Sequence, residues 1–225
     1  MFRKYEKTFR VKTPKIHVPG KLILSDADKK ALLTGQIVIE EKIDGANVGI
    51  IGSKNDKTMF RLQKRGSLVD TSEHPQFQRF KAWTMERFLD LAKLRKPYII
   101  YGEFMWATHH IFYDALPDWF ICFDVWDGTQ YVDRHTKEEF CKEYNLEIIP
   151  LIYEGYVDSV IDIENKLYGL SAYSTDHDRE GIVIKNHRKQ MRAKLVRPEF
   201  VKEIDEDGVH WTTKWDPSKI NKLKG

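Results

Sequence analysis

The 225-residue sequence is poor in cysteine: it has only Cys122 and Cys141, and neither belongs to a C-x-x-C pair. Structural zinc sites and thiol-exchange sites are typically built on such pairs, so the sequence argues against both. We expect the two cysteines to be buried free thiols, with a single disulfide as the alternative.

Long apolar runs are also missing. No stretch approaches the roughly 18 consecutive apolar residues of a membrane-spanning helix, and Met1–Tyr5 does not lead into the apolar stretch of a signal peptide. We therefore expect an intracellular protein without membrane association, cytoplasmic if its source is a prokaryote or a virus.

The net charge is small, because 37 Lys and Arg residues are balanced by 34 Asp and Glu residues, which gives +3. The small net charge excludes a simple polycationic chain, but the basic and acidic residues are unevenly distributed along the sequence. Residues 1–30 contain nine basic and three acidic residues, residues 179–225 contain twelve and seven, and residues 185–197 hold six basic residues without an acid. A polyanion is the natural partner of such a cluster, and a solvated basic strand pair is the alternative.

The sequence does contain enough apolar material for a core, since 41% of its residues are hydrophobic and 12% are aromatic. This composition argues against disorder. Apolar periodicity predicts strands at residues 36–43, 46–52, 58–63, 98–104, 119–126, 147–153, 181–185 and 191–196. Helices are predicted at residues 74–94 and 158–170, and a capping box of Thr136 and Glu139 predicts a short helix that ends near Tyr144.

Successive strands with few helices predict an α+β fold with mostly antiparallel sheets flanked by helices, and not a dinucleotide-binding βαβ fold. No internal repeat or Pro/Gly/Ser-rich linker is visible. We predict one domain over residues 1–204 and a short C-terminal extension over residues 205–225. Trp211 and Trp215 are expected to pack this extension against the domain.

Charged residues recur near the ends of the predicted strands. Lys42-Ile43-Asp44-Gly45 stands where a strand ends on a glycine turn, which presents a lysine at the rim of a sheet. Glu103 lies within an otherwise apolar strand, where an unpaired carboxylate is costly and therefore usually has a ligand, a metal or a cation as partner. Alternation places Arg192 and Lys194 on one face of the last strand. Further candidates are Arg65-Gly66, Phe123-Asp124 and the segment from Glu180 to Lys185.

In this order, the segments resemble the motifs of the covalent nucleotidyltransferases, the superfamily of ATP-dependent polynucleotide ligases and GTP-dependent mRNA capping enzymes. The stretch from Glu41 to Asn47, the Tyr101-Gly102-Glu103 triplet, and Lys194 followed by Pro198-Glu199-Phe200 are most similar to the RNA ligase 2 family. Asp44 stands where many members of that family have His, and Arg192 stands where the fifth motif often has Lys.

This resemblance implies an ATP-grasp-like nucleotidyltransferase domain whose lysine attacks ATP, passes AMP to a 5′-phosphate end and lets a 3′-hydroxyl displace it. It implies catalytic roles for Lys42, Asp44 and Lys194. It implies that Glu180 is a Mg²⁺ ligand, with Mn²⁺ as a substitute metal. The nucleotide-binding residues that it implies are Glu41, Lys42, Arg65 on ribose or pyrophosphate, Glu103 on ribose, Phe123 on adenine, Glu180, and the phosphate-side cations Lys185, Arg192 and Lys194.

Lys42 can attack only as a neutral amine. A reference pKa of about 10.4 means that deprotonation costs about 4.6 kcal/mol at pH 7. Lys194, Arg65, a bound cation and partial burial would each lower the pKa of Lys42, whereas direct pairing with Asp44 would raise it.

Only about 25 residues follow Phe200, which is too few for the C-terminal oligonucleotide-binding barrel that many members of the superfamily carry. Either the basic N-terminal segment and the tail assist the domain, or a partner protein supplies the missing nucleic-acid binding. We expect an ATP-dependent RNA ligase that acts on RNA with 5′-phosphate and 3′-hydroxyl ends. A minimal DNA ligase, a guanylyltransferase and a non-catalytic nucleic-acid-binding module are the alternatives.

Overall fold

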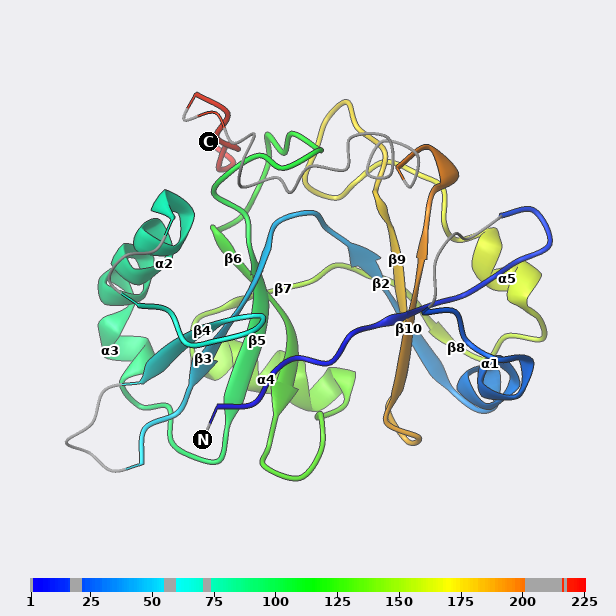
Figure 1. Ribbon diagram of the computed structural model, residues 1–225, viewed down its shortest axis with the longest axis horizontal. Coiled ribbons are helices and arrows are strands. Elements are labelled where there is room, and N and C mark those ends of the chain that lie inside the picture. Colours follow the sequence, from blue (N-terminus) through cyan, green and yellow to red (C-terminus); the bar gives the residue numbers. More distant parts are fainter. Residues whose placement is uncertain (1, 17–21, 55–59, 71–73, 201–215, 217) are drawn as a thin grey trace. The chain divides into compact units, whose positions relative to one another are not determined.

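The computed structural model describes residues 2–16, 22–54, 60–70, 74–200, 216 and 218–225, which fall into two compact units. The first, here called the Glu103 unit, comprises Met1–Glu6, Asp44–Ile149 and Trp215–Gly225. The second, the Lys42 unit, comprises Lys7–Ile43 and Pro150–Lys214. Each unit contains one five-stranded sheet (Figure 1). Among the described residues, no helix is long and apolar enough to cross a membrane.

The sheet of the Glu103 unit has the strand order β4-β3-β5-β6-β7. Neighbouring strands are antiparallel except for β6 and β7, which are parallel. The strands are β3 (Ala46–Ile51), β4 (Arg61–Lys64), β5 (Ile99–Phe104), β6 (Phe120–Trp126) and β7 (Glu147–Ile148). The helices of this unit are α2 (Pro75–Glu86), α3 (Phe88–Leu91) and α4 (Arg134–Glu143).

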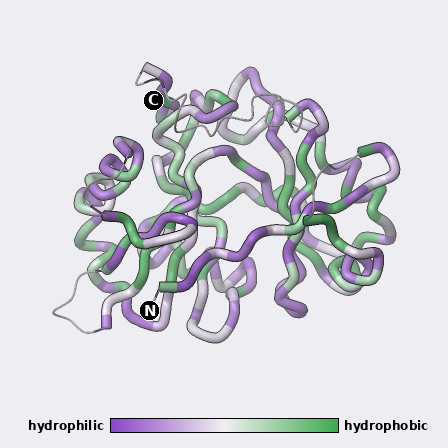
Figure 2. The backbone as a smooth tube through the Cα atoms, viewed as in Figure 1, coloured by the Kyte–Doolittle hydropathy of each residue, from purple (hydrophilic) through white to green (hydrophobic). Residues whose placement is uncertain are grey.

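Aromatic packing joins α2 to its sheet. Apolar and polar residues alternate along this helix (Figure 2), and its buried face presents Phe80 and Trp83. The Trp83 ring stacks on Phe120 of β6 at 5.1 Å, and the Phe80 ring lies 5.1 Å from Phe104 of β5. Because such rings bury large apolar areas, this layer fixes the strand that carries Glu103.

The sheet of the Lys42 unit has the strand order β1-β10-β9-β2-β8 and is antiparallel except for the β1–β10 pair. Its strands are β1 (Phe9–Arg10), β2 (Ile37–Lys42), β8 (Leu151–Gly155), β9 (Gly181–Asn186) and β10 (Met191–Val196). Helices α1 (Asp26–Leu33) and α5 (Val160–Glu164) accompany this sheet (Figure 1).

The core of the Lys42 unit lies on one face of its sheet, because alternate residues of a strand point to opposite faces. Alternate apolar residues of β2, β9 and β10 enter a buried cluster with the helices and the N-terminal segment. Its fully buried members are Val11, Ile16, Leu32, Ile37, Ile39, Ile163, Leu167, Ile182, Ile184, Ala193 and Leu195. The opposite face of these strands carries polar residues, among them Glu40 and Lys185, next to valines such as Val38.

The structure confirms the predicted α+β class with mostly antiparallel sheets. Both cysteines are buried and free, as expected. Trp211, Trp215 and the predicted boundary after residue 204 lie outside the described residues, so the domain boundary and the packing of the two tryptophans stay predictions.

Several predicted element bounds were wrong. The strand predicted over residues 147–153 is two strands in different sheets, β7 and β8, and Pro150 lies between them. The helix predicted over residues 74–94 is divided at Arg87 into α2 and α3, and the one predicted over residues 158–170 has only the single turn of α5. In each case the apolar pattern continues past the end of the element.

The predicted capping box was also wrong. Helix α4 begins at Arg134, and its N-cap is Asp133, whose carboxylate accepts a hydrogen bond from the Thr136 backbone N–H at 2.8 Å. Aspartate three residues before Thr136 is a strong N-cap, so the helix starts one turn earlier than the Thr136/Glu139 pattern predicts.

Candidate active site

The sheet register of the Lys42 unit collects several predicted site residues on the face opposite the core. Lys42 pairs with Gly181, and Lys185 of β9 pairs with Arg192 of β10. Directly paired residues of an antiparallel sheet point to the same face, as do second neighbours along a strand. Four predicted site residues therefore share this face, here called the site face: Lys42, Lys185, Arg192 and Lys194.

Lys42 forms an ion pair with Glu180, the residue that precedes β9. Its Nζ atom lies 2.5 Å from Oε2 of Glu180, and the side chains are 22% and 5% exposed, respectively. A carboxylate at this distance stabilises the ammonium form of the lysine, which cannot attack phosphorus. The nucleophilic role that is predicted for Lys42 would therefore require that Glu180 be drawn away or neutralised by another cation.

Glu180 fits the predicted role of a Mg²⁺ ligand in its chemistry. Mg²⁺ typically takes one or two protein carboxylates, and waters and phosphate oxygens complete its octahedron. Within the described part of the chain, no group of three or more His, Cys, Asp or Glu could form a metal cage. Glu180 supplies a single, nearly buried carboxylate next to Lys42.

Lys185 takes part in a buried ion pair. Its Nζ atom lies 2.7 Å from Oε2 of Glu40, and both side chains are at most 3% exposed. A buried pair of this kind is strongly destabilised when one partner is removed. Arg192 and Lys194 are half-buried and alternate with the buried Ala193 and Leu195, so the predicted shared face of the two basic residues is confirmed.

Glu41 points away from the site face, because it directly precedes Lys42 in β2. Its carboxylate is buried and accepts hydrogen bonds from the Ser171 hydroxyl at 2.6 Å and the Ala172 N–H at 3.0 Å. Burial raises the pKa of Glu41, and these two hydrogen bonds oppose that rise. In this structure Glu41 anchors the loop that precedes Glu180.

Asp44 and Gly45 form a turn that makes hydrogen bonds to several other residues of the Glu103 unit. The Asp44 N–H donates to the Tyr113 hydroxyl at 2.9 Å, and the Gly45 N–H donates to Oε1 of Glu103 at 3.2 Å. Oδ2 of Asp44 accepts the His110 N–H at 2.8 Å and lies 3.1 Å from its Nδ1. The structure thus brings together Asp44 and Glu103, two of the predicted residues.

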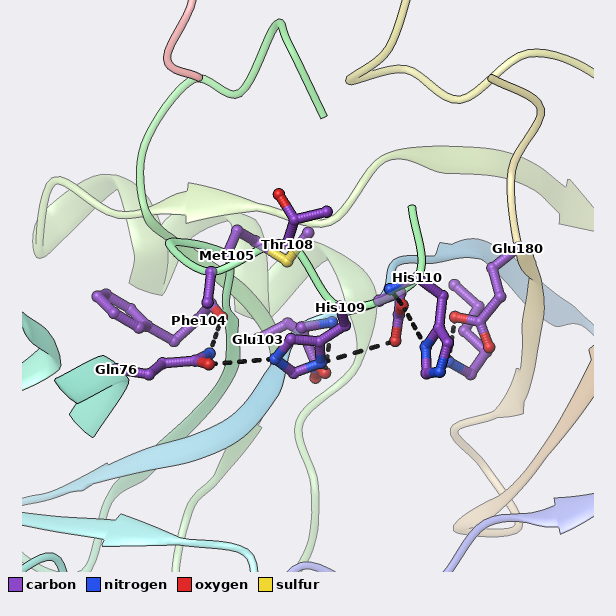
Figure 3. A network of polar contacts seen from close by, with 12 residues as sticks. Gln76, Glu103, Phe104, Met105, Thr108, His109, His110 and Glu180 are labelled. Carbon is purple, nitrogen blue, oxygen red and sulfur yellow. Dashed lines mark hydrogen bonds and ion pairs between the residues drawn. The ribbon is translucent and has the colours of Figure 1, made fainter. Parts of the chain in front are cut away.

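A second histidine extends this network (Figure 3). His109 Nδ1 lies 3.9 Å from Oδ1 of Asp44, and His109 Nε2 lies 3.1 Å from Oε1 of Gln76. The Gln76 amide nitrogen donates to the Phe104 carbonyl at 3.0 Å, so the Gln76 oxygen faces the histidine. His109 Nε2 must then carry a proton, and only a second proton on Nδ1 makes the contact with Asp44 attractive.

Phe123 occupies a β-bulge. Tyr101 of β5 pairs with Asp124 and Gly102 pairs with Cys122, so Phe123 is the extra residue on β6. The half-buried Phe123 ring meets Tyr5 edge-on at 5.0 Å, and the Tyr5 hydroxyl donates to Asp124 at 2.5 Å. Bulges re-aim side chains next to functional sites, which suits a residue predicted to stack on a base.

Arg65 lies in the Glu103 unit directly after β4, and its side chain is exposed. It stands apart from the network of Asp44 and Glu103 in the described contacts. A Cβ on the following Gly66 would meet nothing within 4 Å, so this motif glycine is not required by packing.

The residues that sequence reasoning missed are His109, His110, Tyr113 and Gln76. His109 and His110 lie in a loop, and both face Asp44. No spacing rule connects residue 44 to residues 109–113, because the loop returns to the turn only in the folded chain. The sequence offered one signal for these residues, which is that polar residues follow directly after the strand that contains Glu103.

Comparison with known proteins identifies the family of the chain. The sequence model of the family described as RNA ligase matches residues 35–196, so the chain belongs to the RNA ligase family. This range contains the predicted segments from Glu41 to Lys194 and ends before Pro198-Glu199-Phe200. A search of curated protein sequences returned no match.

Solved structures of a Naegleria gruberi RNA ligase have a similar fold. The enzyme with PPi gives a TM-score of 0.60 at 16% identity over 80% of this chain and 55% of that chain. An alanine variant without ligand gives 0.59 at 14% over 80% and 54%, and a variant with ATP and Mn gives 0.58 at 13% over 80% and 54%. The present chain therefore spans about half the length of these solved relatives.

Proposed function

We propose that the chain is an ATP-dependent RNA ligase that joins 3′-hydroxyl and 5′-phosphate RNA ends through a lysyl-AMP intermediate on Lys42. One observation carries this proposal. The family-matched lysine lies at the end of β2 on a sheet face with Arg192 and Lys194, and it is paired with Glu180. A nucleophile, phosphate-side cations and a metal-type carboxylate are the parts that nucleotidyl transfer to lysine requires.

In the first step, the neutral Nζ of Lys42 attacks the α-phosphorus of ATP. As the N–P bond forms, the bond between the α-phosphorus and the bridging oxygen breaks, and pyrophosphate leaves. The nitrogen is positively charged after the attack and then loses one proton. The AMP is then transferred to the 5′-phosphate of RNA, and the 3′-hydroxyl displaces it. Structures of the Naegleria gruberi enzyme with ATP and Mn and with PPi support this choice of substrate and leaving group.

Residues of the site face supply the electrostatics. Lys194 and Arg192 neutralise charge that develops on the α-phosphate, and they disfavour a second ammonium at Lys42. Lys185, with its charge balanced by Glu40, contributes less to phosphate binding than Lys194. When Glu180 holds a divalent cation, Mg²⁺ or Mn²⁺, that cation supplies charge neutralisation for the phosphates.

The Glu103 unit supplies the groups that contact the nucleoside. Glu103 binds the ribose, Phe123 stacks on adenine, and Arg65 binds ribose or pyrophosphate, as the family resemblance implies. Glu41 supports the nucleotide-binding residues from behind the sheet through Ser171 and Ala172. Nucleic-acid binding beyond these residues comes from the basic N-terminal segment and the tail, or from a partner protein.

A mass measurement tests the proposal. The protein is incubated with ATP or GTP and Mg²⁺, and its intact mass and peptide map are recorded. We expect one AMP on Lys42, no adduct after Lys42→Ala and none from GTP. A GMP adduct would indicate a guanylyltransferase, and the absence of any adduct would indicate a binding module.

The nucleic-acid substrate needs a second test. Nicked duplexes that differ only in RNA or DNA on the 3′-hydroxyl side are offered to the AMP-loaded protein. We expect faster sealing of the RNA nick, and equal or faster sealing of the DNA nick would favour the DNA ligase alternative.

A further inference from the structure

The segment of residues 218–225 is built into the Glu103 unit by backbone hydrogen bonds. It reaches two stretches of the chain, residues 106–108 and residues 113–116. The Thr108 N–H donates to the Lys219 carbonyl at 3.0 Å, and the Lys222 N–H donates to the Tyr113 carbonyl at 2.8 Å. Isolated bridges pair Ala107 with Ile220 and Leu116 with Leu223. The segment therefore spans both ends of the loop of residues 105–113.

Asn221 is the centre of this contact. The residue is 2% exposed, and its amide makes hydrogen bonds in both directions. Nδ2 donates to the Met105 carbonyl at 2.6 Å and the Ala107 carbonyl at 3.3 Å. Oδ1 accepts the Tyr113 N–H and the Thr108 hydroxyl, both at 2.9 Å. One side chain thus ties together the start and the end of the loop.

Both ends of this loop touch the turn that follows Lys42. The Tyr113 hydroxyl accepts the Asp44 N–H, and a Cβ on Gly45 would lie 2.7 Å from the sulfur of Met105. Between these ends, His109 and His110 face the Asp44 carboxylate, and Figure 3 shows Met105, Thr108 and both histidines along one stretch of chain. Asn221 therefore reaches the turn through two routes, Met105 to Gly45 and Tyr113 to Asp44.

We propose that Asn221 is a positioning residue for nucleotidyl transfer, which holds the loop of residues 105–113 in the shape that orients Asp44 and Gly45. This inference rests on the proposed function, and it assigns part of the site to a segment about 180 residues away in sequence. Asn221 acts through its neighbours and touches no substrate. A misplacement of catalytic groups by a fraction of an ångström lowers a rate without abolishing binding.

The chemistry of the contact explains why the residue is an asparagine. The two carbonyl oxygens need a hydrogen-bond donor, whereas the Tyr113 N–H and the Thr108 hydroxyl need an acceptor. Only a carboxamide supplies two N–H donors and an acceptor oxygen within one short side chain. Aspartate would place a carboxylate against the Met105 and Ala107 carbonyls. Alanine would leave three buried backbone groups and the part-buried Thr108 hydroxyl without this partner.

The test compares full-length Asn221→Ala and Asn221→Asp with Ser218→Ala as a matched control. Ser218 lies in the same segment, and its hydroxyl bonds only to Asp216 in the described contacts. Three quantities are measured: the end-point AMP per protein, the maximal single-turnover rate of Lys42 adenylation, and the ATP concentration at half-maximal rate. The end point counts competent molecules, so loss of folded protein is separated from slower chemistry.

We expect Asn221→Ala and Asn221→Asp to lower the maximal rate at least tenfold, with the end point close to that of the wild type and half-saturation within about threefold. Ser218→Ala should keep the wild-type rate. An unchanged rate per competent molecule in either Asn221 variant would overturn the proposal, as would an equal fall in Ser218→Ala.

Two further measurements keep the test decisive. If Asn221→Ala does not fold, Thr108→Val is measured instead, because it removes one hydrogen bond to Oδ1 of Asn221. We expect it to lower the adenylation rate about two- to fivefold, and a wild-type rate would contradict the proposal. Hydrogen exchange of residues 105–113 should rise in the Asn221 variants even if no adduct forms. Faster exchange in the Asn221 variants, together with no AMP adduct on the wild-type protein, would contradict the proposed function. It would still support the inference that Asn221 holds this loop.

Discussion

At Gly45 of the Lys42-Ile43-Asp44-Gly45 motif, the surrounding atoms leave no room for a side chain. A Cβ there would lie 2.8 Å from the Phe104 carbonyl and 3.0 Å from Cγ of Glu103. The Phe104 carbonyl belongs to the backbone of a central strand and cannot move without disturbing the sheet. Within the Glu103 unit, this glycine therefore lets the chain enter β3 close beside β5.

We expect Gly45→Ala to destabilise the protein by about 1–3 kcal/mol, because the added methyl overpacks a rigid contact. The rate of Lys42 adenylation should fall as well, since the Asp44 turn is displaced. Chemical denaturation and adduct formation measure the two effects. Gly66→Ala is the control, because a Cβ there meets nothing within 4 Å, and it should change stability little. Equal costs at both glycines would contradict the packing argument.

Glu41 gives a pH-dependent prediction. Its pKa is raised by burial above the ordinary value of 4.5, so the folded state binds this proton more tightly than the unfolded state. The contribution of Glu41 to stability is therefore full below pH 4.5 and is lost as the pH rises through the higher folded pKa. Glu41→Gln should remove this loss, so its stability relative to the wild type should increase from about pH 4 to pH 7.

Denaturation at several pH values measures this difference. The control is Glu143→Gln on the exposed side of α4, which should run parallel to the wild type. A constant difference between Glu41→Gln and the wild type across the pH range would show that Glu41 is not the titrating group.

At the scale of elements, the β-bulge of β6 decides the direction of Phe123. Without the extra residue, regular alternation would point Phe123 and Asp124 to opposite faces, yet both contact Tyr5. The N-terminal segment and the bulged strand thus form one aromatic group, which also contains Tyr101 and Tyr131.

We expect Phe123→Ala to weaken ATP binding by about 1–3 kcal/mol, or roughly 5- to 150-fold, because base stacking is lost. Calorimetry on a Lys42→Ala background measures binding without covalent reaction. Phe123→Tyr keeps the ring and should bind ATP nearly as the parent does. Unchanged affinity in Phe123→Ala would remove the residue from the nucleotide site.

At the scale of the whole molecule, two units with separate cores are assembled from interleaved stretches of chain. The basic cluster at residues 185–197 is also distributed by the fold. Lys185 pairs with Glu40, Lys189 donates to the Ala31 carbonyl, and Arg197 pairs with Asp178. Only part of the cluster that suggested a polyanion partner therefore lies on the site face.

A chain that stops after Lys214 should lose structure selectively. The Lys42 unit keeps all of its residues, whereas the Glu103 unit loses the segment that bonds to residues 105–116. Hydrogen exchange should rise in residues 106–116 and stay unchanged in β9 and β10. Uniform protection across both units, or uniform loss, would contradict the division into units.

The sequence by itself determined the local elements and the list of candidate residues. Strand alternation in β10 predicted the shared face of Arg192 and Lys194, because a period of two is a local property of the backbone. The order of motifs around Lys42, Glu103 and Glu180 indicated the family that the comparison confirmed.

Only the tertiary structure decided which distant groups meet. Lys42 pairs with Glu180, two histidines lie at Asp44, and Asn221 bonds to the loop of residues 105–113. The partners in these contacts are 65 to 138 positions apart, and no periodicity encodes such separations. Buried polar groups must find partners wherever the folded chain brings a matching donor or acceptor. These contacts are set by sheet register and loop closure, which exist only once the cores of the two units have formed.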